Sequence, residues 1–426
     1  MIRNLSFVHF ALFMLVSPFA TASDHTIYVR AGHLIDVIAG EVSSDQVVVI
    51  ENDRIARVGS ANDISIPAGS EVIDLSDHTV LPGLIDMHDH LTGDHRVHGY
   101  VALGVSVPRE TLYGVLNAQK TIDAGFTTVR NVGAGGYSDV ALRDAINEGE
   151  IVGPRMRVSG PSLGITGGHC DNNLLPAEYA EVAEGVADGP WAVRAKVREV
   201  IKYGADVIKF CATGGVLSKG TSLGVQQYTL EEMQALVDEA HLHGRKVAAH
   251  AHGAQGIKTA IQAGVDSIEH ASLIDDEGIR MAKRNGTFLV MDIYNDTFIL
   301  EFGASVGMLE ESLEKEREIG QLQRDNFRKA FEAGVRMAFG SDGAVYPHGD
   351  NGKQFAYMVE YGMTPMQAIQ AATVHAAELI GWPDSVGAIE AGRFADIIAV
   401  DGNPLENVRS LEDVNFVMKG GVVYKQ

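Results

Sequence analysis

Short apolar runs alternate with longer amphipathic segments along about 300 residues of this chain, between Leu81 and Trp382. Several amphipathic segments end in Ala-Gly or Tyr-Gly just before the next apolar run, which is a helix-termination signal. The predicted strands are 84–90, 127–131, 156–160, 206–212, 246–252, 266–271, 287–293 and 336–341, and the predicted helices include 110–124, 139–148, 192–203, 230–243, 256–263, 317–333 and 365–379. Eight such repeats are typical of a (β/α)8 TIM barrel, although a doubly wound open sheet has the same alternation.

The two ends of the chain have a different texture, with short β-prone runs separated by turns rich in Gly, Asn and Asp. They occupy residues 26–74 and 395–424, and each end alone has too few strands to be stable. We therefore expect both ends to pair into one β-sandwich, giving an α/β protein with a barrel over residues 82–385 and sandwich parts at 23–81 and 386–426. Two independent half-domains are the alternative.

Residues 1–22 are typical of a secretory signal peptide. Arg3 provides a positive start, an apolar stretch follows from Phe7 to Phe19, and Ala20-Thr21-Ala22 fits a cleavage site before Ser23. A membrane anchor is the alternative, but the stretch is short for a transmembrane span. We expect a periplasmic or secreted protein, free of the membrane after cleavage.

Composition narrows the possible partners. The formal net charge is −22, which disfavours binding to nucleic acid or to an anionic membrane surface. Cys170 and Cys211 are the only two cysteines, so no disulfide framework is expected and both are expected to serve packing.

Residues that can bind metal stand at the ends of several predicted strands. His88 and His90 share one strand face because side chains alternate with period 2. Later strands add Lys209, inside an apolar run, then His250 and His270, and the last strand leads into Asp342. The carboxyl ends of barrel strands form the active site of TIM-barrel enzymes, so the six side chains are expected to converge there. Taken singly, each has a structural explanation as well.

The order His-x-His, Lys, His, His, Asp resembles the amidohydrolase superfamily, as does a β-sandwich built from both chain ends. The resemblance implies two divalent metals, most commonly Zn²⁺, one held by His88, His90 and Asp342 and the other by His250 and His270. It also implies that Lys209 bridges them as an N-carboxylated lysine formed with CO2. Burial beside two cations lowers the pKa of an amine, which permits this modification.

Short sequence segments resemble the exported dipeptidase-like branch of this superfamily, which includes Xaa-Pro dipeptidases, Xaa-Arg/Lys carboxypeptidases and ochratoxin-hydrolysing amidases. The similar segments are Gly214-Gly215-Val216, Ser218-Lys219-Gly220 and Gln227-Tyr228-Thr229. The resemblance implies that Asp342 moves the proton of the attacking water. His169 and Tyr228 are candidates to donate a hydrogen bond to the developing oxyanion, and His252 is a candidate to support the metal ligands.

The expected reaction is hydrolysis of the amide bond to a C-terminal amino acid in a dipeptide or N-acyl amino acid, including amides like ochratoxin A. Arg130, Lys219, His169 and Tyr228 are the candidates to bind the substrate's α-carboxylate. The alternatives are a mononuclear deaminase, a cyclic-amide hydrolase, and a periplasmic binding protein without metal. A bridging lysine argues against the deaminase. We also expect a homo-oligomer.

Overall fold

The computed structural model describes residues 25–426, so the predicted signal peptide at 1–22 lies outside the described residues. The strands are β1 (Thr26–Asp36), β2 (Glu41–Glu51), β3 (Arg54–Ser60), β4 (Glu71–Pro82), β5 (Leu84–Asp89), β6 (Phe126–Asn131), β7 (Arg155–Val158), β8 (Val207–Cys211), β9 (Lys246–Gly253), β10 (Ser267–Leu273), β11 (Phe288–Val290), β12 (Ile397–Val400), β13 (Val414–Lys419) and β14 (Val422–Lys425).

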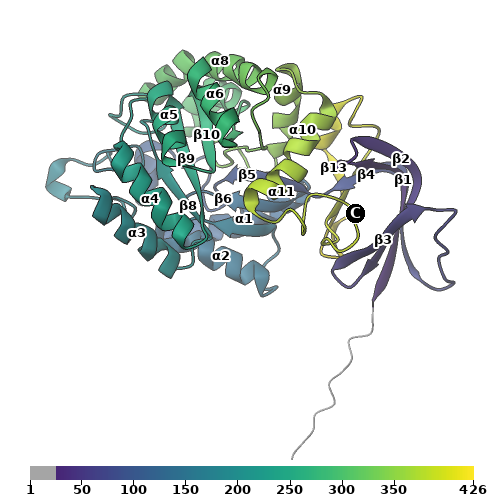
Figure 1. Ribbon diagram of the computed structural model, residues 1–426. Helices are drawn as coiled ribbons and strands as arrows, with labels where there is room; N and C mark the ends of the chain where they lie inside the picture. Colours follow the sequence, from purple (N-terminus) through teal and green to yellow (C-terminus); the bar gives the residue numbers. More distant parts are fainter. Residues whose placement is uncertain (1–24) are drawn as a thin grey trace, which may run out of the picture.

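Eleven α-helices accompany these strands within residues 25–426, mostly around the central parallel strands (Figure 1). They are α1 (Val107–Asp123), α2 (Ser138–Asn147), α3 (Pro190–Lys202), α4 (Leu230–Leu242), α5 (Ala254–Ala263), α6 (Asp276–Asn285), α7 (Asn295–Phe302), α8 (Glu310–Glu332), α9 (Gln354–Glu360), α10 (Pro365–Ala371) and α11 (Val374–Ile380). In this part of the chain, we find no helix with the length and apolar character needed to cross a membrane.

The central parallel strands form two sheets, β5-β6-β7 and β8-β9-β10-β11. Backbone hydrogen bonds connect them on both sides. Leu163, after β7, donates to the carbonyl of Lys209 in β8, and residues 336–343 hydrogen-bond to β11 on one side and to β5 on the other. The hydrogen-bonded order therefore returns to its starting strand. Because both faces of these strands are covered, every residue of β5, β6 and β8 is buried.

Two sequence predictions need correction in this region. The predicted strand 336–341 makes only an isolated bridge between Leu289 and Met337, so it is not a regular strand. The predicted helix 365–379 is interrupted between α10 and α11, where Thr373 has φ −134° and ψ −96°. The Thr373 hydroxyl donates to the carbonyl of Ile369, a local bond that competes with continuous helix.

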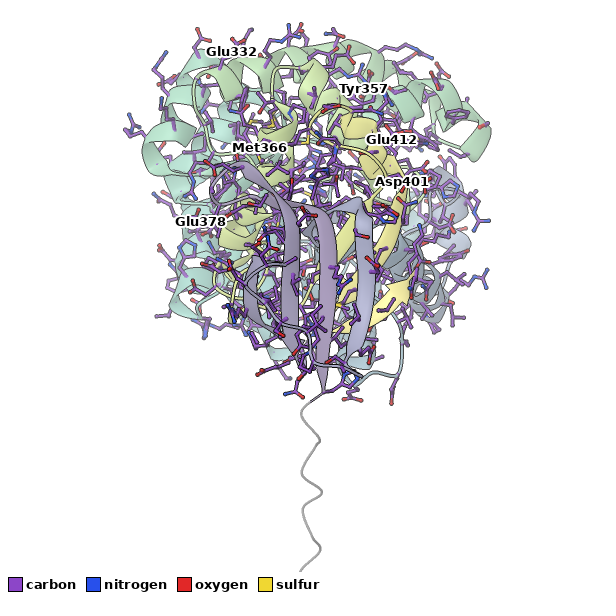
Figure 2. The ribbon with its side chains drawn as sticks, turned by 90° about the vertical axis from the view of Figure 1, so that its right-hand side faces the viewer. Glu332, Tyr357, Met366, Glu378, Asp401 and Glu412 are labelled. Atoms are coloured by element: carbon purple, nitrogen blue, oxygen red, sulfur yellow. A yellow bond between two sulfur atoms is a disulfide. The ribbon has the colours of Figure 1, made fainter. Side chains whose placement is uncertain are left out.

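The two chain ends meet in one seven-stranded sheet, in the order β14-β13-β12-β4-β1-β2-β3. The junction is the antiparallel pairing of β4 with β12, in which Val80 lies opposite Ala399. Figures 1 and 2 show the N-terminal strands beside the C-terminal ones. The predicted pairing of the ends is therefore present. Within residues 25–426 it forms a single hydrogen-bonded sheet rather than two.

Helix ends near the central strands follow local signals. Thr229 caps α4 by accepting from the backbone N–H of Glu232, whose side chain accepts in return from the backbone N–H of Thr229. Asp275 caps the start of α6, and Gly286, with φ 73°, caps its end after Asn285. These caps set where each helix begins and ends, and so how the connecting loops approach the carboxyl ends of the strands.

Candidate metal centre

His88 lies in β5 and His90 directly follows the end of that strand at Asp89, and both rings line the same cavity, as the predicted alternation implies. Nδ1 of His88 lies 3.0 Å from Oε2 of Glu269, and Nδ1 of His90 lies 3.2 Å from the carbonyl oxygen of Gly133. Each partner fixes a ring so that its Nε2 points the other way. Both Nε2 atoms lie 3.3 Å from Oδ1 of Asp342. If a metal ion binds these three groups, the partners of the two Nδ1 atoms would hold the imidazole rings in the orientation that coordination needs.

Asp342 lies in the segment 336–343 that hydrogen-bonds to β11 and β5. Its backbone φ is 56°, and its side chain faces the two histidines. Its backbone N–H donates to the carbonyl of His88, and Asn295 donates to its Oδ2 over 3.1 Å. Burial raises the pKa of this carboxyl, but the charge and hydrogen bonds of His88 and His90 dominate and hold the pKa well below its usual value. Asp342 is therefore an anionic carboxylate facing two imidazoles.

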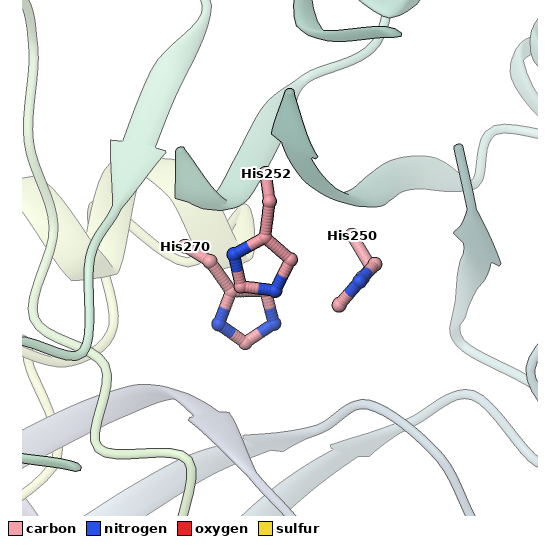
Figure 3. Close-up of side chains that lie close together, drawn as sticks. All are labelled: His250, His252 and His270. Atoms are coloured by element: carbon pink, nitrogen blue, oxygen red, sulfur yellow. The ribbon is translucent and has the colours of Figure 1, made fainter. Parts of the chain in front are cut away.

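A second group of histidines, shown in Figure 3, consists of His250, His252 and His270. His250, His252 and His270 each offer a ring nitrogen, and these nitrogens lie within 4.8 Å of one another. The rings of His252 and His270 stack with centroids 4.8 Å apart, and His270 lies at the same distance from His88. His270, Asp292 and Asp342 form a third possible ligand group. The two histidine groups are therefore continuous.

The residues present fit a metal ion. Nε2 of His250 is buried and has no hydrogen-bond partner among the described residues, which is costly for a polar atom unless a ligand binds it. Nδ1 of His270 lies 2.8 Å from Oδ1 of Asp292, and Nδ1 of His252 lies 2.8 Å from the hydroxyl of Ser272. Burial keeps the pKa values of His250 and His252 well below normal, so both are neutral and able to coordinate.

Lys209 lies in β8 and is only 3% exposed. Burial, opposed in part by the charges of Glu269 and Asp342, lowers its pKa to about 8. Lys209 lines one cavity of about 700 Å³ together with all five other predicted ligands: His88, His90, His250, His270 and Asp342. The structure therefore brings the six residues to one place, as the sequence analysis expected.

His169 also lies in this cavity. Its ring stacks on that of His250 with centroids 4.1 Å apart, and its Nδ1 lies 2.7 Å from the hydroxyl of Ser218. Burial lowers its pKa to about 3, so the ring is neutral and has one N–H to donate. This position suits the predicted contact with substrate.

Three other predicted substrate contacts lie elsewhere. Tyr228 does not line the cavity and donates its hydroxyl to the carbonyl of Ala187, so its hydroxyl is used within the fold. Arg130 is buried and binds Glu269 with N–O distances of 2.8 and 2.9 Å. Lys219 is on the surface, where its Nζ donates to the hydroxyl of Tyr100 over 2.7 Å. For Tyr228 and Lys219 the barrel position does not determine which way a loop turns the side chain, and for Arg130 the strand directs the side chain to the buried Glu269 of β10 rather than to the cavity.

The prediction for the cysteines is also wrong. Cys170 and Cys211 form a disulfide, with Cα atoms 5.9 Å apart. The hydrogen bonds between Leu163 and β8 bring the loop after β7 over the end of β8, although 41 residues separate the two cysteines in sequence. The disulfide attaches the residue after His169 to the strand that carries Lys209.

Residues without an assigned role in the sequence analysis hold the ligands in place. Glu269 joins His88 to Arg130, and Asp292 joins His270 to Asn295, which donates to it over 2.6 Å. The sequence signal that could have identified Glu269 and Asp292 is their position near the ends of predicted strands. Glu269 precedes His270, and Asp292 lies near the end of the predicted strand 287–293, where side chains that face an active site are expected.

The family comparison agrees with this geometry. The model of the Amidohydrolase family matches residues 79–425 of the chain. The chain belongs to this family. It is similar to ochratoxinase from Aspergillus niger, with 35% identity over 414 residues covering 91% of this chain and 84% of ochratoxinase.

Two solved structures extend the similarity of this amidohydrolase. A Xaa-Pro dipeptidase with methionine bound in its active site superposes with a TM-score of 0.90 and 41% identity, covering 94% of this chain and 100% of that one. A prolidase complexed with N-methylphosphonate-L-proline superposes with a TM-score of 0.86 and 30% identity, with the same coverage. The predicted membership of the dipeptidase and ochratoxinase branch is confirmed, and the amidohydrolase is a hydrolytic enzyme.

Proposed function

We propose that this amidohydrolase uses two divalent metal ions to hydrolyse the amide bond to a C-terminal amino acid in dipeptides or N-acyl amino acids. The observation that carries the proposal is the joint presence of two ligand groups, connected through Asp342, in one cavity of about 700 Å³. That volume suits a small molecule rather than a protein substrate.

The proposed ligands of one ion are His88, His90 and Asp342, and those of the other are His250 and His270. Imidazole and carboxylate donors favour Zn²⁺. Lys209 is proposed to bridge the ions after carboxylation by CO2, which its lowered pKa of about 8 supports because the neutral amine is the reactive form. When bound, the two ions supply an activated water and polarise the scissile carbonyl.

The chain's own groups handle protons and charge. Asp342 is proposed to accept the proton of the attacking water at its carboxylate and to return one to the leaving nitrogen, as a general base and then a general acid. Asn295 restrains Oδ2 of this carboxylate. His169, held by Ser218 and stacked on His250, is proposed to donate its N–H to the oxygen that becomes negative.

The relatives support the substrate class. Ochratoxinase, a Xaa-Pro dipeptidase and a prolidase are named for hydrolysis of amide or dipeptide substrates. Arg130, Lys219 and Tyr228 do not line the cavity, so binding of a substrate α-carboxylate is assigned to His169 and other neutral donors there. An amide like ochratoxin A also belongs to the proposed substrate range.

The finer architecture is part of the proposal. The hydrogen-bonded order that returns to β5 supports a complete (β/α)8 barrel over residues 82–385. Ile55 near one edge of the terminal sheet and Phe416 near the other belong to one apolar cluster, which supports a sheet folded into a sandwich from 23–81 and 386–426.

Export to the periplasm or medium is proposed from residues 1–22 and is supported by the Cys170–Cys211 disulfide, because such bonds persist in oxidising compartments. The chain is further proposed to act without nucleic acid or membrane partners and to assemble as a homo-oligomer. N-terminal sequencing of the exported protein and light scattering test these points.

The decisive experiment combines elemental analysis with product analysis. We expect two metal ions per chain and release of the C-terminal residue from dipeptides and N-acyl amino acids, with slower hydrolysis of the corresponding C-terminal amides. One metal ion per chain with ammonia release from a nucleobase would favour the alternative deaminase. Ring opening of cyclic amides without dipeptide hydrolysis would favour the cyclic-amide hydrolase.

A further inference from the structure

Glu316 is a buried acidic residue in the cavity wall that the proposed reaction does not use. It lies on α8, where Glu316, Ile319 and Gln323 follow at spacings that place them on one helix face, and all three line the cavity. Glu316 is only 4% exposed. Gln323 donates to Oδ1 of Asp292, which also binds His270, so this helix face adjoins the metal centre.

The Glu316 carboxylate has no hydrogen-bond or ion-pair partner among residues 25–426. The nearby cation is already engaged, since Arg324 pairs with Asp296 over 2.8 Å and donates to Ile293 and Thr297. Burial, followed by the negative charges of Asp296 and Asp292, raises the pKa of Glu316 to about 8, and Arg324 offsets this only in part. With that pKa, Glu316 is mainly a neutral carboxylic acid at pH 7, and a cation bound beside it would favour the ionised carboxylate.

The rest of the wall has the same sign of charge. Glu110 and Glu184 also line the cavity, and burial together with the charge of Glu184 raises the pKa of Glu110. Among the described residues, the only lysine or arginine that lines the cavity is Lys209, which is assigned to the metal centre. A positively charged ligand group therefore finds a carboxyl acceptor here, and the nearby basic side chain, Arg324, is already paired with Asp296.

We propose that Glu316 binds a positively charged group of the substrate, an ammonium or guanidinium, and so gives this enzyme a preference for cationic amides. The inference rests on the proposed function. The cation has two possible sources in a dipeptide: the free α-amine of the first residue, or the side chain of a lysine or arginine. Both supply charge-assisted hydrogen bonds to a carboxylate.

The test measures kcat and KM for two matched pairs with the metal-loaded enzyme. N-acetylglycyl-lysine against N-acetylglycyl-norleucine tests the side chain, and glycyl-norleucine against N-acetylglycyl-norleucine tests the α-amine. In at least one pair we expect the cationic member to have a kcat/KM at least about tenfold higher, mainly through KM. The pair that responds identifies the source of the charge.

Glu316→Gln should abolish this preference and leave the neutral substrates within about twofold of the wild type, because the amide keeps the shape and cannot ionise to pair with a bound cation. Glu316→Asp should retain part of the preference. The matched control is Glu318→Gln, an exposed residue of the same helix that does not line the cavity, and it should change nothing. Glu316→Gln should not lower the melting temperature at pH 7, since the Glu316 carboxyl is mainly neutral there and has no protein partner among the described residues.

Three results would overturn the inference: hydrolysis without charge preference in the wild type, equal losses on both members of a pair in Glu316→Gln, or a preference that survives this substitution. If the wild type hydrolyses no amide, the proposed function fails separately. Calorimetric binding of Nα-acetyl-lysine and Nα-acetylnorleucine to the wild type and to Glu316→Gln then decides the inference without turnover. Equal binding of the two ligands to the wild type would exclude a side-chain site.

Discussion

Glu269 connects the metal centre to the interior of the protein through His88. Its Oε2 lies 3.0 Å from Nδ1 of His88, and both side chains are at most 1% exposed. The same carboxylate pairs with Arg130, which also donates to the carbonyl of Met87 in β5. Burial opposes ionisation of Glu269, but Arg130 and His88 hold its pKa far below normal. A permanent anion therefore orients the His88 ring.

Glu269→Gln should weaken metal binding about 10–100-fold, because a neutral amide orients the His88 ring less strongly than the carboxylate does. It should also destabilise the fold by about 3–5 kcal/mol, since Arg130 remains buried without its counter-ion. Metal affinity is measured by chelator competition and stability by urea unfolding. The control is Glu239→Gln, which removes a carboxylate of α4 that pairs with Arg198 of α3. This variant should leave the metal affinity unchanged. A wild-type affinity in Glu269→Gln would remove this orienting role.

Lys209→Ala should lose most of the bound metal and nearly all activity if Lys209 bridges two ions as a carbamate. A short carboxylic acid added to this variant should restore part of both. The control is Lys419→Met, because burial also lowers the pKa of Lys419 to about 8 but this residue lies in β13 and does not line the cavity. Full activity of Lys209→Ala with two metal ions bound would contradict the bridging role.

Asp342→Asn should retain much of the metal and lose at least about 10²-fold in kcat, because the amide cannot accept the proton of the attacking water. Elemental analysis and steady-state kinetics on the same preparation separate these effects. Glu184→Gln changes a carboxylate that lines the same cavity but belongs to neither ligand group, and should keep kcat for a neutral substrate. An unchanged rate in Asp342→Asn would assign the proton to another group.

Replacing Cys170 and Cys211 together by serine should lower the free energy of unfolding by about 2–4 kcal/mol, since the bond closes a loop across 41 residues. We also expect a lower kcat/KM, because the bond anchors the loop that carries His169 next to Lys209. Thiol titration of the unfolded wild type should find free thiols only after reduction. The single-site control Cys170→Ala plus reductant should match the double variant, and unchanged stability of the double variant would contradict the anchoring role.

The sequence alone determined which strand residues can face the metal centre. Period-2 alternation along the predicted strand 84–90 turns His88 and His90 to the same side, and both line the cavity although β5 itself ends at Asp89. Repeated strand-helix alternation predicts that Lys209, His250, His270 and the residues after the last strand gather at one end of the central strands. Short β-prone runs at both chain ends predicted that the two ends pair, and β4 and β12 form that pairing. These features depend on local periodicity and chain order, which a single sequence contains.

Only the tertiary structure decided what the loops and helices add. Tyr228 is turned into the core and Cys170 meets Cys211 because of how loops pack over the strands. Arg130 of β6 pairs with Glu269 of β10 because the arrangement of the strands brings the two side chains together. Glu316 had no distinguishing pattern in a helix rich in glutamate. Its burial in the cavity wall follows from the placement of α8 against β10, and contacts between segments so distant in sequence are set by packing rather than by local preference.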